Sequence, residues 1–189
     1  EIMNEMFFAD FDRDGFREIL TEAGEVREVS IDFIVNKENS SKLNAARAIA
    51  DRLVEYGFDV TLRALSWSDY VYELEHQNFD MYYAEVQLTA DFDVSCILDI
   101  WAELDYGGIG GSDYGSMIDS FLAREEDDSI KQLLASQLYD YIGRNAAIVP
   151  VLFKRAAVLT RWGSLSGHEP VYSNLFYGIT NWKITLEKS

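Results

Sequence analysis

Three aspartates at alternate positions, Asp10, Asp12 and Asp14, precede Gly15 and resemble the opening of a calcium-binding loop. In such loops alternate carboxylates and a glycine turn surround the ion, and a bidentate glutamate completes the site at the twelfth position. Thr21 occupies that twelfth position in this sequence. Because the ligand set is incomplete, the sequence favours an acidic turn before a strand, and we expect no bound metal.

Two glycine patterns resemble motifs of dinucleotide binding and nucleophilic catalysis, and both are incomplete. Gly108 and Gly110 would need a further glycine at the position of Asp113 to form a dinucleotide loop. The segment 163–167 places Leu165 where a nucleophile elbow has its serine. We therefore interpret both segments as flexible connectors.

The remaining polar residues do not define a catalytic set. His76 and His168 are far apart and lack the spacing of a paired metal site. With 33 acidic residues, a glycosidase-like pair of carboxylates stays open, and a carbohydrate-active hydrolase domain is the alternative function. We expect no catalytic residue and predict that the chain is not an enzyme.

Charge and cysteine content narrow the classes of partner and site. The chain has 33 acidic and 16 basic residues, which give a net charge of −17 and no clustered basic face for nucleic acid. The single cysteine, Cys96, excludes an internal disulfide and a zinc site built from four cysteines. We expect Cys96 to be a small buried apolar residue.

Alternating and helical patterns in residues 29–86 predict the elements that would position a site. Strands are expected over 29–35, 58–64 and 79–86, because apolar and polar residues alternate in the first two of these segments. Helices are expected over 42–56 and from about 66 to 77, with side-chain caps at their starts. Three strands joined by two helices with short loops predict a βαβαβ core with a parallel sheet.

The rest of the chain is less regular. Residues 106–112 are expected to form a glycine-rich loop, and helices are expected over 117–123 and 129–142. The valine-rich segment 147–160 predicts an added return strand, and residues 163–189 predict turns and short strands.

Ligands of open parallel sheets bind beyond the carboxyl ends of the strands, so these loops define the candidate site. Trp67 offers a flat apolar surface there, and carboxylates such as Asp91 offer partners for a cationic group. Asp91 and Asp93 could equally be solvated loop acids or helix caps. The predicted binding residues are Asn36, Trp67, Tyr83, Glu85, Gln87 and Asp91.

The order of several segments resembles the family 5 extracellular solute-binding proteins, the peptide- and nickel-binding group of ABC importers. The resemblance runs from about residue 10 to residue 184. The matching segments are 43–53, 57–62, 67–70, 79–82, 88–93, 145–151 and 176–182.

The resemblance implies a periplasmic-binding-protein-like type II lobe, an α/β fold that closes on its ligand with a second lobe. It implies that residues 1–160 form the second, C-terminal large lobe and that residues 161–189 return toward the first lobe. It also implies capture of a peptide or similar small solute, an ABC permease as membrane partner, an extracytoplasmic location, a monomer and no cofactor. In peptide-binding members an aspartate after the third strand holds the ligand's α-amino group, and Asp91 best matches that position. Gln87 and Val94 stand where the family often has other residues, which argues against a simple peptide ligand.

Overall fold

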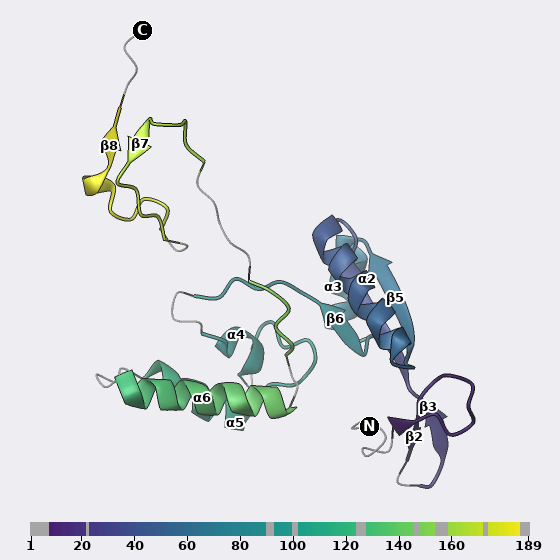
Figure 1. Ribbon diagram of the computed structural model, residues 1–189. Helices are drawn as coiled ribbons and strands as arrows, with labels where there is room; N and C mark the ends of the chain where they lie inside the picture. The colour runs from purple at the N-terminus through teal and green to yellow at the C-terminus, as the bar shows by residue number, and fades with distance from the viewer. Residues whose placement is uncertain are drawn as a thin grey trace. The chain divides into compact units, whose positions relative to one another are not determined.

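The computed structural model describes residues 8–21, 23–89, 93–99, 102–123, 128–145, 148–153, 159–171 and 174–185 (Figure 1). The chain forms two compact units. The first contains residues 1–87 and 106–108, and the second contains residues 88–105 and 109–189. The predicted boundary between residues 160 and 161 stays a prediction.

The first unit begins with a small antiparallel sheet of three short strands, β1 (Phe8–Ala9), β2 (Glu18–Leu20) and β3 (Val26–Glu28). Strand β2 lies in the middle and pairs with both neighbours. The acidic residues 10–16 form the loop from β1 to β2. The expected turn before a strand is therefore present, and the strand that follows it is β2.

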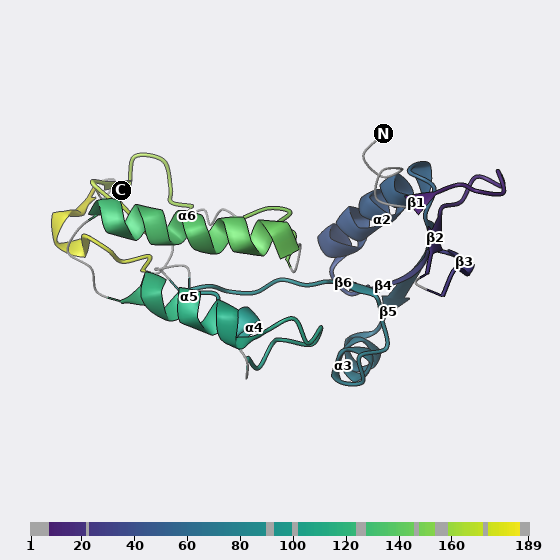
Figure 2. The same ribbon diagram turned by 90° about the horizontal axis from the view of Figure 1, so that it is seen from below.

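A parallel sheet forms the centre of the first unit, with β4 (Ser30–Asn36) between β5 (Asp59–Leu65) and β6 (Met81–Tyr83). All seven residues of β4 pair with β5, from Ser30 opposite Asp59 to Asn36 opposite Leu65. Helices α2 (Ser40–Glu55) and α3 (Trp67–Glu75) cover opposite faces of the sheet (Figure 2). The predicted βαβαβ core is thus confirmed, although β6 is shorter than the predicted segment 79–86.

The alternation along β4 divides its side chains between the two helices. Phe33 and Val35 pack with Ala46 and Ala50 of α2. Ile34, between them in sequence, packs with Tyr70 and Leu74 of α3. Since successive strand residues point to opposite faces, β4 is buried on both sides, as expected for a central parallel strand.

An ion-pair network fixes β5 to β4 and to α3. Two of the three guanidinium nitrogens of Arg63, Nε and Nη2, donate to the two carboxylate oxygens of Asp32, at 2.8 and 2.7 Å. Arg63 also pairs with Glu73 at 3.3 Å and donates to the carbonyl oxygen of Asn78 at 2.5 Å. The hydrogen bond to Asp32 raises the pKa of Arg63 above its ordinary value.

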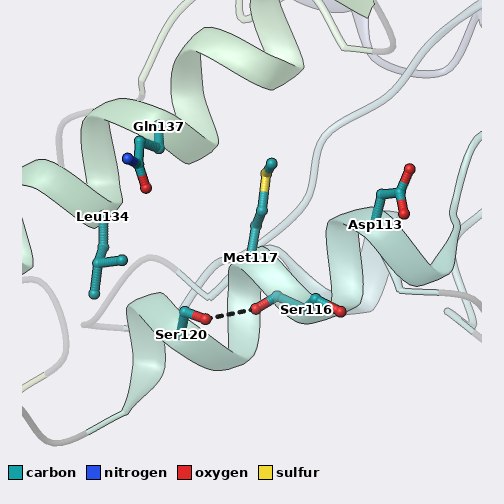
Figure 3. Close-up of a pocket in the computed structure, with 6 residues that line it drawn as sticks. All are labelled: Asp113, Ser116, Met117, Ser120, Leu134 and Gln137. Carbon is teal, nitrogen blue, oxygen red and sulfur yellow. Dashed lines mark hydrogen bonds between the residues drawn. The ribbon is translucent and has the colours of Figure 1, made fainter.

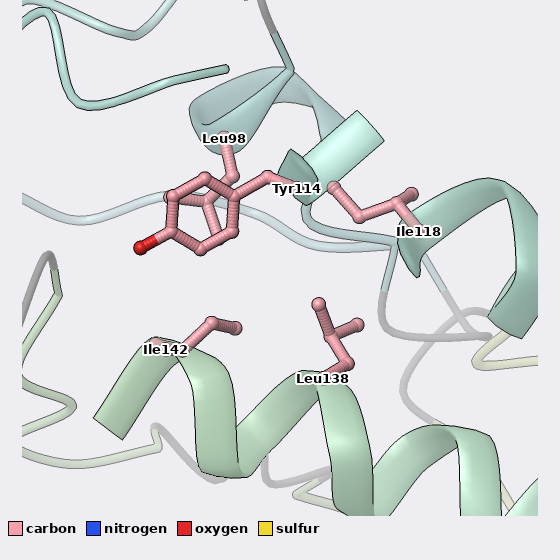
Figure 4. Packing of buried hydrophobic residues seen from close by; sticks show 5 residues of the cluster. All are labelled: Leu98, Tyr114, Ile118, Leu138 and Ile142. Carbon is pink, nitrogen blue, oxygen red and sulfur yellow. The ribbon is translucent and has the colours of Figure 1, made fainter. Parts of the chain in front are cut away.

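The second unit has a helical core made from α4 (Ser95–Leu98), α5 (Ser112–Leu122) and α6 (Asp128–Asn145). Five side chains from these three helices meet in a cluster (Figure 4). They are Leu98, Tyr114, Ile118, Leu138 and Ile142. Helix α6 agrees with the predicted helix over 129–142.

Helix α5 begins at Ser112, five positions before the predicted start at residue 117. The carboxylate of Asp105 accepts the backbone N–H groups of Ile109 and Gly110, both at 2.8 Å, and so orders the glycine-rich loop. A Cβ at Gly110 would lie 2.4 Å from the carbonyl oxygen of Asp99, so this close approach requires glycine. An ordered loop lets the helix begin directly after it.

The predicted return strand over 147–160 is wrong for the part of that segment that the structure describes. Residues 148–153, 159 and 160 belong to no strand. A valine-rich pattern indicates that a segment can pair, but pairing also requires a partner strand, which the pattern does not supply. The tail contains short strands β7 (Leu165–Ser166) and β8 (Lys183–Ile184), paired antiparallel, and a 3₁₀ turn, η1 (Ile179–Asn181).

Among the described residues, no helix combines the length and the apolar character that crossing a membrane requires.

Candidate functional site

The ends of three parallel strands meet at one edge of the sheet. Asn36 lies opposite Leu65, and Val35 lies opposite Tyr83. The loops that follow these strands therefore leave the sheet on the same side, as the sequence predicted. We call the strand ends at Asn36, Leu65 and Tyr83, with the residues that follow them, the carboxyl edge.

Asn36 is the last residue of β4 and is 7% exposed. The Nδ2 atom of its side chain is buried and has no hydrogen-bond acceptor among the described residues. An amide NH₂ group has two protons to donate, and burying it without an acceptor is unfavourable. Asn36 therefore offers an unused donor at the carboxyl edge.

Tyr83 ends β6, and its position depends on α3. The hydroxyl of Tyr70 donates to the backbone carbonyl oxygen of Tyr83 at 3.0 Å. Burial, together with the nearby phenols of Tyr82 and Tyr106, raises the pKa of Tyr70 well above its ordinary value, so the hydroxyl stays a donor. The Tyr83 ring is half-buried against the α2 side of the sheet, so only part of it is exposed at the edge.

Trp67 is the most exposed aromatic residue at the carboxyl edge, with 57% of its surface accessible. It begins α3 directly after Ser66, whose hydroxyl oxygen caps the helix by accepting the Asp69 N–H at 3.3 Å. Its backbone N–H donates to the Glu38 carboxylate at 3.0 Å, and its ring lies 6.0 Å from that of Tyr70. The backbone of Trp67 is thus fixed by a hydrogen bond while its ring stays open to solvent, as a stacking surface requires.

Glu85 follows β6 and pairs with Lys42 of α2, with Nζ and Oε2 3.1 Å apart. This ion pair compensates the negative charge of Glu85, which the sequence had included among the predicted binding residues. Gln87 is exposed and is the last residue of this stretch of the first unit. The two residues contribute polar surface to the edge rather than a free anion.

The residues predicted beyond Gln87 are only partly described. Asp91, the predicted charge anchor, lies outside the described residues. Asp93 lies in the second unit and accepts the backbone N–H of Ser95 at 2.8 Å, at the start of α4. This is a local side-chain-to-backbone bond one residue before the N-cap of α4, Val94.

Sequence reasoning did not identify three residues that organise this edge, Glu38, Lys42 and Tyr70. Tyr70 acts through its hydrogen bond to the next strand, which local patterns do not predict. Glu38 lies two positions after the end of β4, and that position was a usable signal for an edge residue. The pairing of Lys42 with Glu85 joins positions 43 residues apart, so it is a tertiary contact that local patterns do not encode.

Two pockets are lined by described residues of the second unit. One, of about 310 Å³, lies between α5 and α6 (Figure 3). Its lining residues are Asp113, Ser116, Met117, Ser120, Leu134 and Gln137. The Ser120 hydroxyl donates to the backbone oxygen of Ser116 at 2.8 Å, a bond within one helix. Its described lining includes one carboxylate, that of Asp113, and no histidine.

The other pocket, of about 370 Å³, includes Cys96 among its lining residues. Burial, with a smaller contribution from Asp93, raises the pKa of this thiol above its ordinary value. A raised pKa reduces the thiolate fraction and so the reactivity of the sulfur. No described residue of the carboxyl edge lines either pocket.

No protein-family model matches the chain, and no curated protein matches it in sequence. Solved structures do match. The oligopeptide-binding protein AppA from Bacillus subtilis, in complex with a nonapeptide, is 15% identical with a TM-score of 0.64, over 98% of this chain and 36% of that one. The periplasmic oligopeptide-binding protein of an ABC transporter from Thermotoga maritima, bound to mannohexaose, is 18% identical with a TM-score of 0.67. That match covers 93% of this chain and 33% of the Thermotoga protein. NikA from Brucella suis, in complex with Fe(III)-EDTA, is 16% identical with a TM-score of 0.59. That match covers 77% of this chain and 29% of NikA.

These similarities define the class of fold. The chain has the α/β fold of periplasmic solute-binding proteins, which confirms the fold expected from the sequence. It spans about a third of the length of the solved proteins it matches.

Proposed function

We propose that this chain is one lobe of the substrate-binding component of an ABC importer, which captures a peptide or similar small solute in a cleft between two lobes. The proposal depends most on one observation, the parallel order β5-β4-β6, which gathers Asn36, Trp67 and Tyr83 at the carboxyl edge. Structures of this fold were solved with a nonapeptide, a hexasaccharide and a metal chelate, so the fold accommodates several ligand classes.

The described residues favour a ligand that has both polar acceptors and a flat or apolar surface. The buried Nδ2 donor of Asn36 has no acceptor among the described residues, and a carbonyl, carboxylate or hydroxyl oxygen of a ligand that reached it would supply one. The exposed ring of Trp67 would stack on a sugar ring or an apolar side chain. Asp91 is proposed, from the family resemblance, to bind an amino group. Peptides and oligosaccharides both carry oxygens that the amide of Asn36 could bind.

The wider context is part of the same proposal. A solute-binding lobe of this class would act outside the cytoplasm, as a monomer, and deliver its ligand to a membrane-embedded permease. The net charge of −17 would keep such a protein soluble and apart from anionic lipid. We further propose that it has no catalytic residue and no role in nucleic-acid binding.

The test is a ligand screen on the complete protein that carries this chain. Thermal shift with a panel of peptides and oligosaccharides should identify a ligand that raises the melting temperature, because binding to the native state stabilises it. Titration calorimetry of that ligand should then show a loss of affinity of about tenfold or more for Trp67→Ala, as for a stacking aromatic residue. The matched control is Tyr72→Ala, which removes another exposed aromatic ring of α3 and should leave affinity unchanged.

Two results would contradict the proposal. One is a complete panel without any stabilising ligand. The other is turnover of a glycoside substrate, which would restore the hydrolase alternative. Asn36→Leu gives a further check, because it removes the amide but keeps the volume, and it should weaken the ligand without unfolding the lobe.

A further inference from the structure

Four carboxylates converge in the loop between β1 and β2. Asp10, Asp12, Asp14 and Glu18 each offer one oxygen, and these oxygens all lie within 4.8 Å of one another. The residues occupy the first, third, fifth and ninth positions of the segment that begins at Asp10. The three aspartates are exposed, whereas Glu18 is buried. Like charges at this separation repel each other unless a cation lies between them.

Glu18 is the observation that distinguishes this cluster from an ordinary acidic turn. Its side chain is only 3% exposed. Its Oε2 atom accepts the backbone N–H of Phe11 at 2.7 Å, but its Oε1 atom is buried and has no donor among the described residues. A buried carboxylate oxygen without a donor is unfavourable, and such groups are stabilised by a paired cation or a bound metal. The unpaired oxygen belongs to the residue that completes the cluster.

Hydrogen bonds to the backbone hold the three aspartates in place. Asp10 accepts the N–H groups of Arg13 and Gly15, at 2.6 and 3.2 Å. Asp12 accepts the N–H of Asp14 at 3.1 Å, and Asp14 accepts the N–H of Phe16 at 2.8 Å. Gly15, at the sixth position, has a φ of +102°, which side-chain-bearing residues rarely adopt. The loop thus has the glycine turn and the fixed carboxylates of an oxygen-lined cation site.

We propose that Asp10, Asp12, Asp14 and Glu18 bind one Ca²⁺ ion. Calcium takes six to eight oxygen ligands in a flexible geometry, which suits a loop of carboxylates supplemented by water or a backbone carbonyl. Zinc favours sulfur and nitrogen ligands, which the cluster lacks, and magnesium demands a near-ideal octahedron at short ligand distances, whereas these carboxylates are already held in place by backbone hydrogen bonds.

This proposal replaces the expectation drawn from the sequence. That expectation was based on the missing glutamate at the twelfth position, occupied by Thr21. The structure supplies a different fourth carboxylate, because β2 pairs with β1 and β3 and thereby directs Glu18 back toward the loop. A ligand contributed by strand pairing is not visible to a motif defined by loop spacing.

Contacts of Arg17, between the loop and Glu18, connect the site to the parallel sheet of the same unit. The backbone N–H of Arg17 donates to the carbonyl oxygen of Gly57 at 2.7 Å, and its Nε donates to that of Tyr56 at 2.5 Å. These acceptors lie at the turn from α2 to β5. Calcium binding would therefore hold the antiparallel sheet against the parallel one and raise the thermal stability of the unit.

Titration calorimetry of CaCl₂ into the chelator-treated 189-residue chain tests the proposal. We expect one saturable site with a Kd on the order of 10⁻⁴ M or tighter, and binding of MgCl₂ at least about tenfold weaker. Glu18→Gln retains an oxygen that can accept the Phe11 N–H, and it should lower calcium affinity about tenfold or more. Asp12→Asn, at an exposed position, should do the same without affecting the fold.

The matched control is Glu28→Gln, which removes the same charge from the residue paired with Glu18 on strand β3. Its calcium affinity should stay within about twofold of the unsubstituted chain. Absence of saturable binding below about 1 mM would overturn the proposal. Equal calcium and magnesium affinities, or unchanged affinity in both Glu18→Gln and Asp12→Asn with native circular dichroism, would also overturn it.

Discussion

The hydroxyl of Tyr70, in helix α3, donates a hydrogen bond of 3.0 Å to the backbone carbonyl oxygen of Tyr83, at the end of strand β6. Tyr70 is 4% exposed, so this bond forms away from solvent. It joins the second crossover helix to the last strand of the sheet and sets where the chain leaves the carboxyl edge.

Tyr70→Phe should therefore destabilise the first unit. The substitution keeps the ring but leaves the Tyr83 carbonyl without this donor, at an expected cost of about 1–2 kcal/mol in unfolding free energy. Urea denaturation followed by circular dichroism measures the change. Tyr72→Phe removes a hydroxyl from an exposed tyrosine of the same helix and should change stability by less than about 0.5 kcal/mol. Equal effects of the two substitutions would show that the buried bond contributes nothing.

Arg63→Met should also lower stability, through loss of the network with Asp32, Glu73 and the Asn78 carbonyl. The side chain is 30% exposed, so solvent screening limits the expected loss to about 1–2 kcal/mol. Arg47→Met, at an exposed position of α2, controls for removal of an arginine. High salt should reduce the difference between the two variants, and a difference that is insensitive to salt would argue against an electrostatic origin.

Cys96 should react slowly with iodoacetamide, with a pH profile displaced to higher pH than that of a free thiol. Burial and the nearby Asp93 raise the pKa of the thiol. A raised pKa means less thiolate at any given pH, so the alkylation rate reaches half its maximum at a higher pH. Asp93→Asn should move the profile partly back, toward lower pH. A midpoint at or below that of N-acetylcysteine would contradict the assignment.

Asp91→Ala should weaken binding of a ligand with a free amino group by about 1.5–3 kcal/mol in the complete protein, as expected for a charged hydrogen bond. Calorimetry with the ligand and with its N-acetylated form measures the effect, since the acetylated ligand has no charge for Asp91 to bind. Asp59→Ala removes an exposed acid at the opposite end of β5 and should leave affinity unchanged. Unchanged affinity in Asp91→Ala would remove this residue from the site.

The parallel core could be predicted from the sequence because its signals are local. The alternation along β4 and the caps of α2 and α3 lie within a few residues of the elements they define. The expected side-chain cap of α2 is provided by Asn39, whose side chain accepts the Lys42 N–H at 3.1 Å. Parallel pairing then followed from the length of the connections.

The features that were missed depend on contacts between distant positions. The valine-rich segment after residue 147 resembled a strand, but nothing local could show whether a partner strand was present. The pairing of Glu85 with Lys42 and the convergence of Glu18 on the acidic loop likewise require the folded chain. Composition indicated an abundance of carboxylates, whereas only the tertiary structure showed which of them are already neutralised.

In the strand order β5-β4-β6, Asn36 ends the central strand β4. After β4 the chain passes over one face of the sheet through α2, and after the neighbouring β5 it passes over the other face through α3. The loops at the ends of these two adjacent strands therefore leave the carboxyl edge toward opposite faces of the sheet. Phe33, Ile34 and Val35 are buried beneath that edge, so the loops can change in sequence while the packing that specifies the fold stays constant.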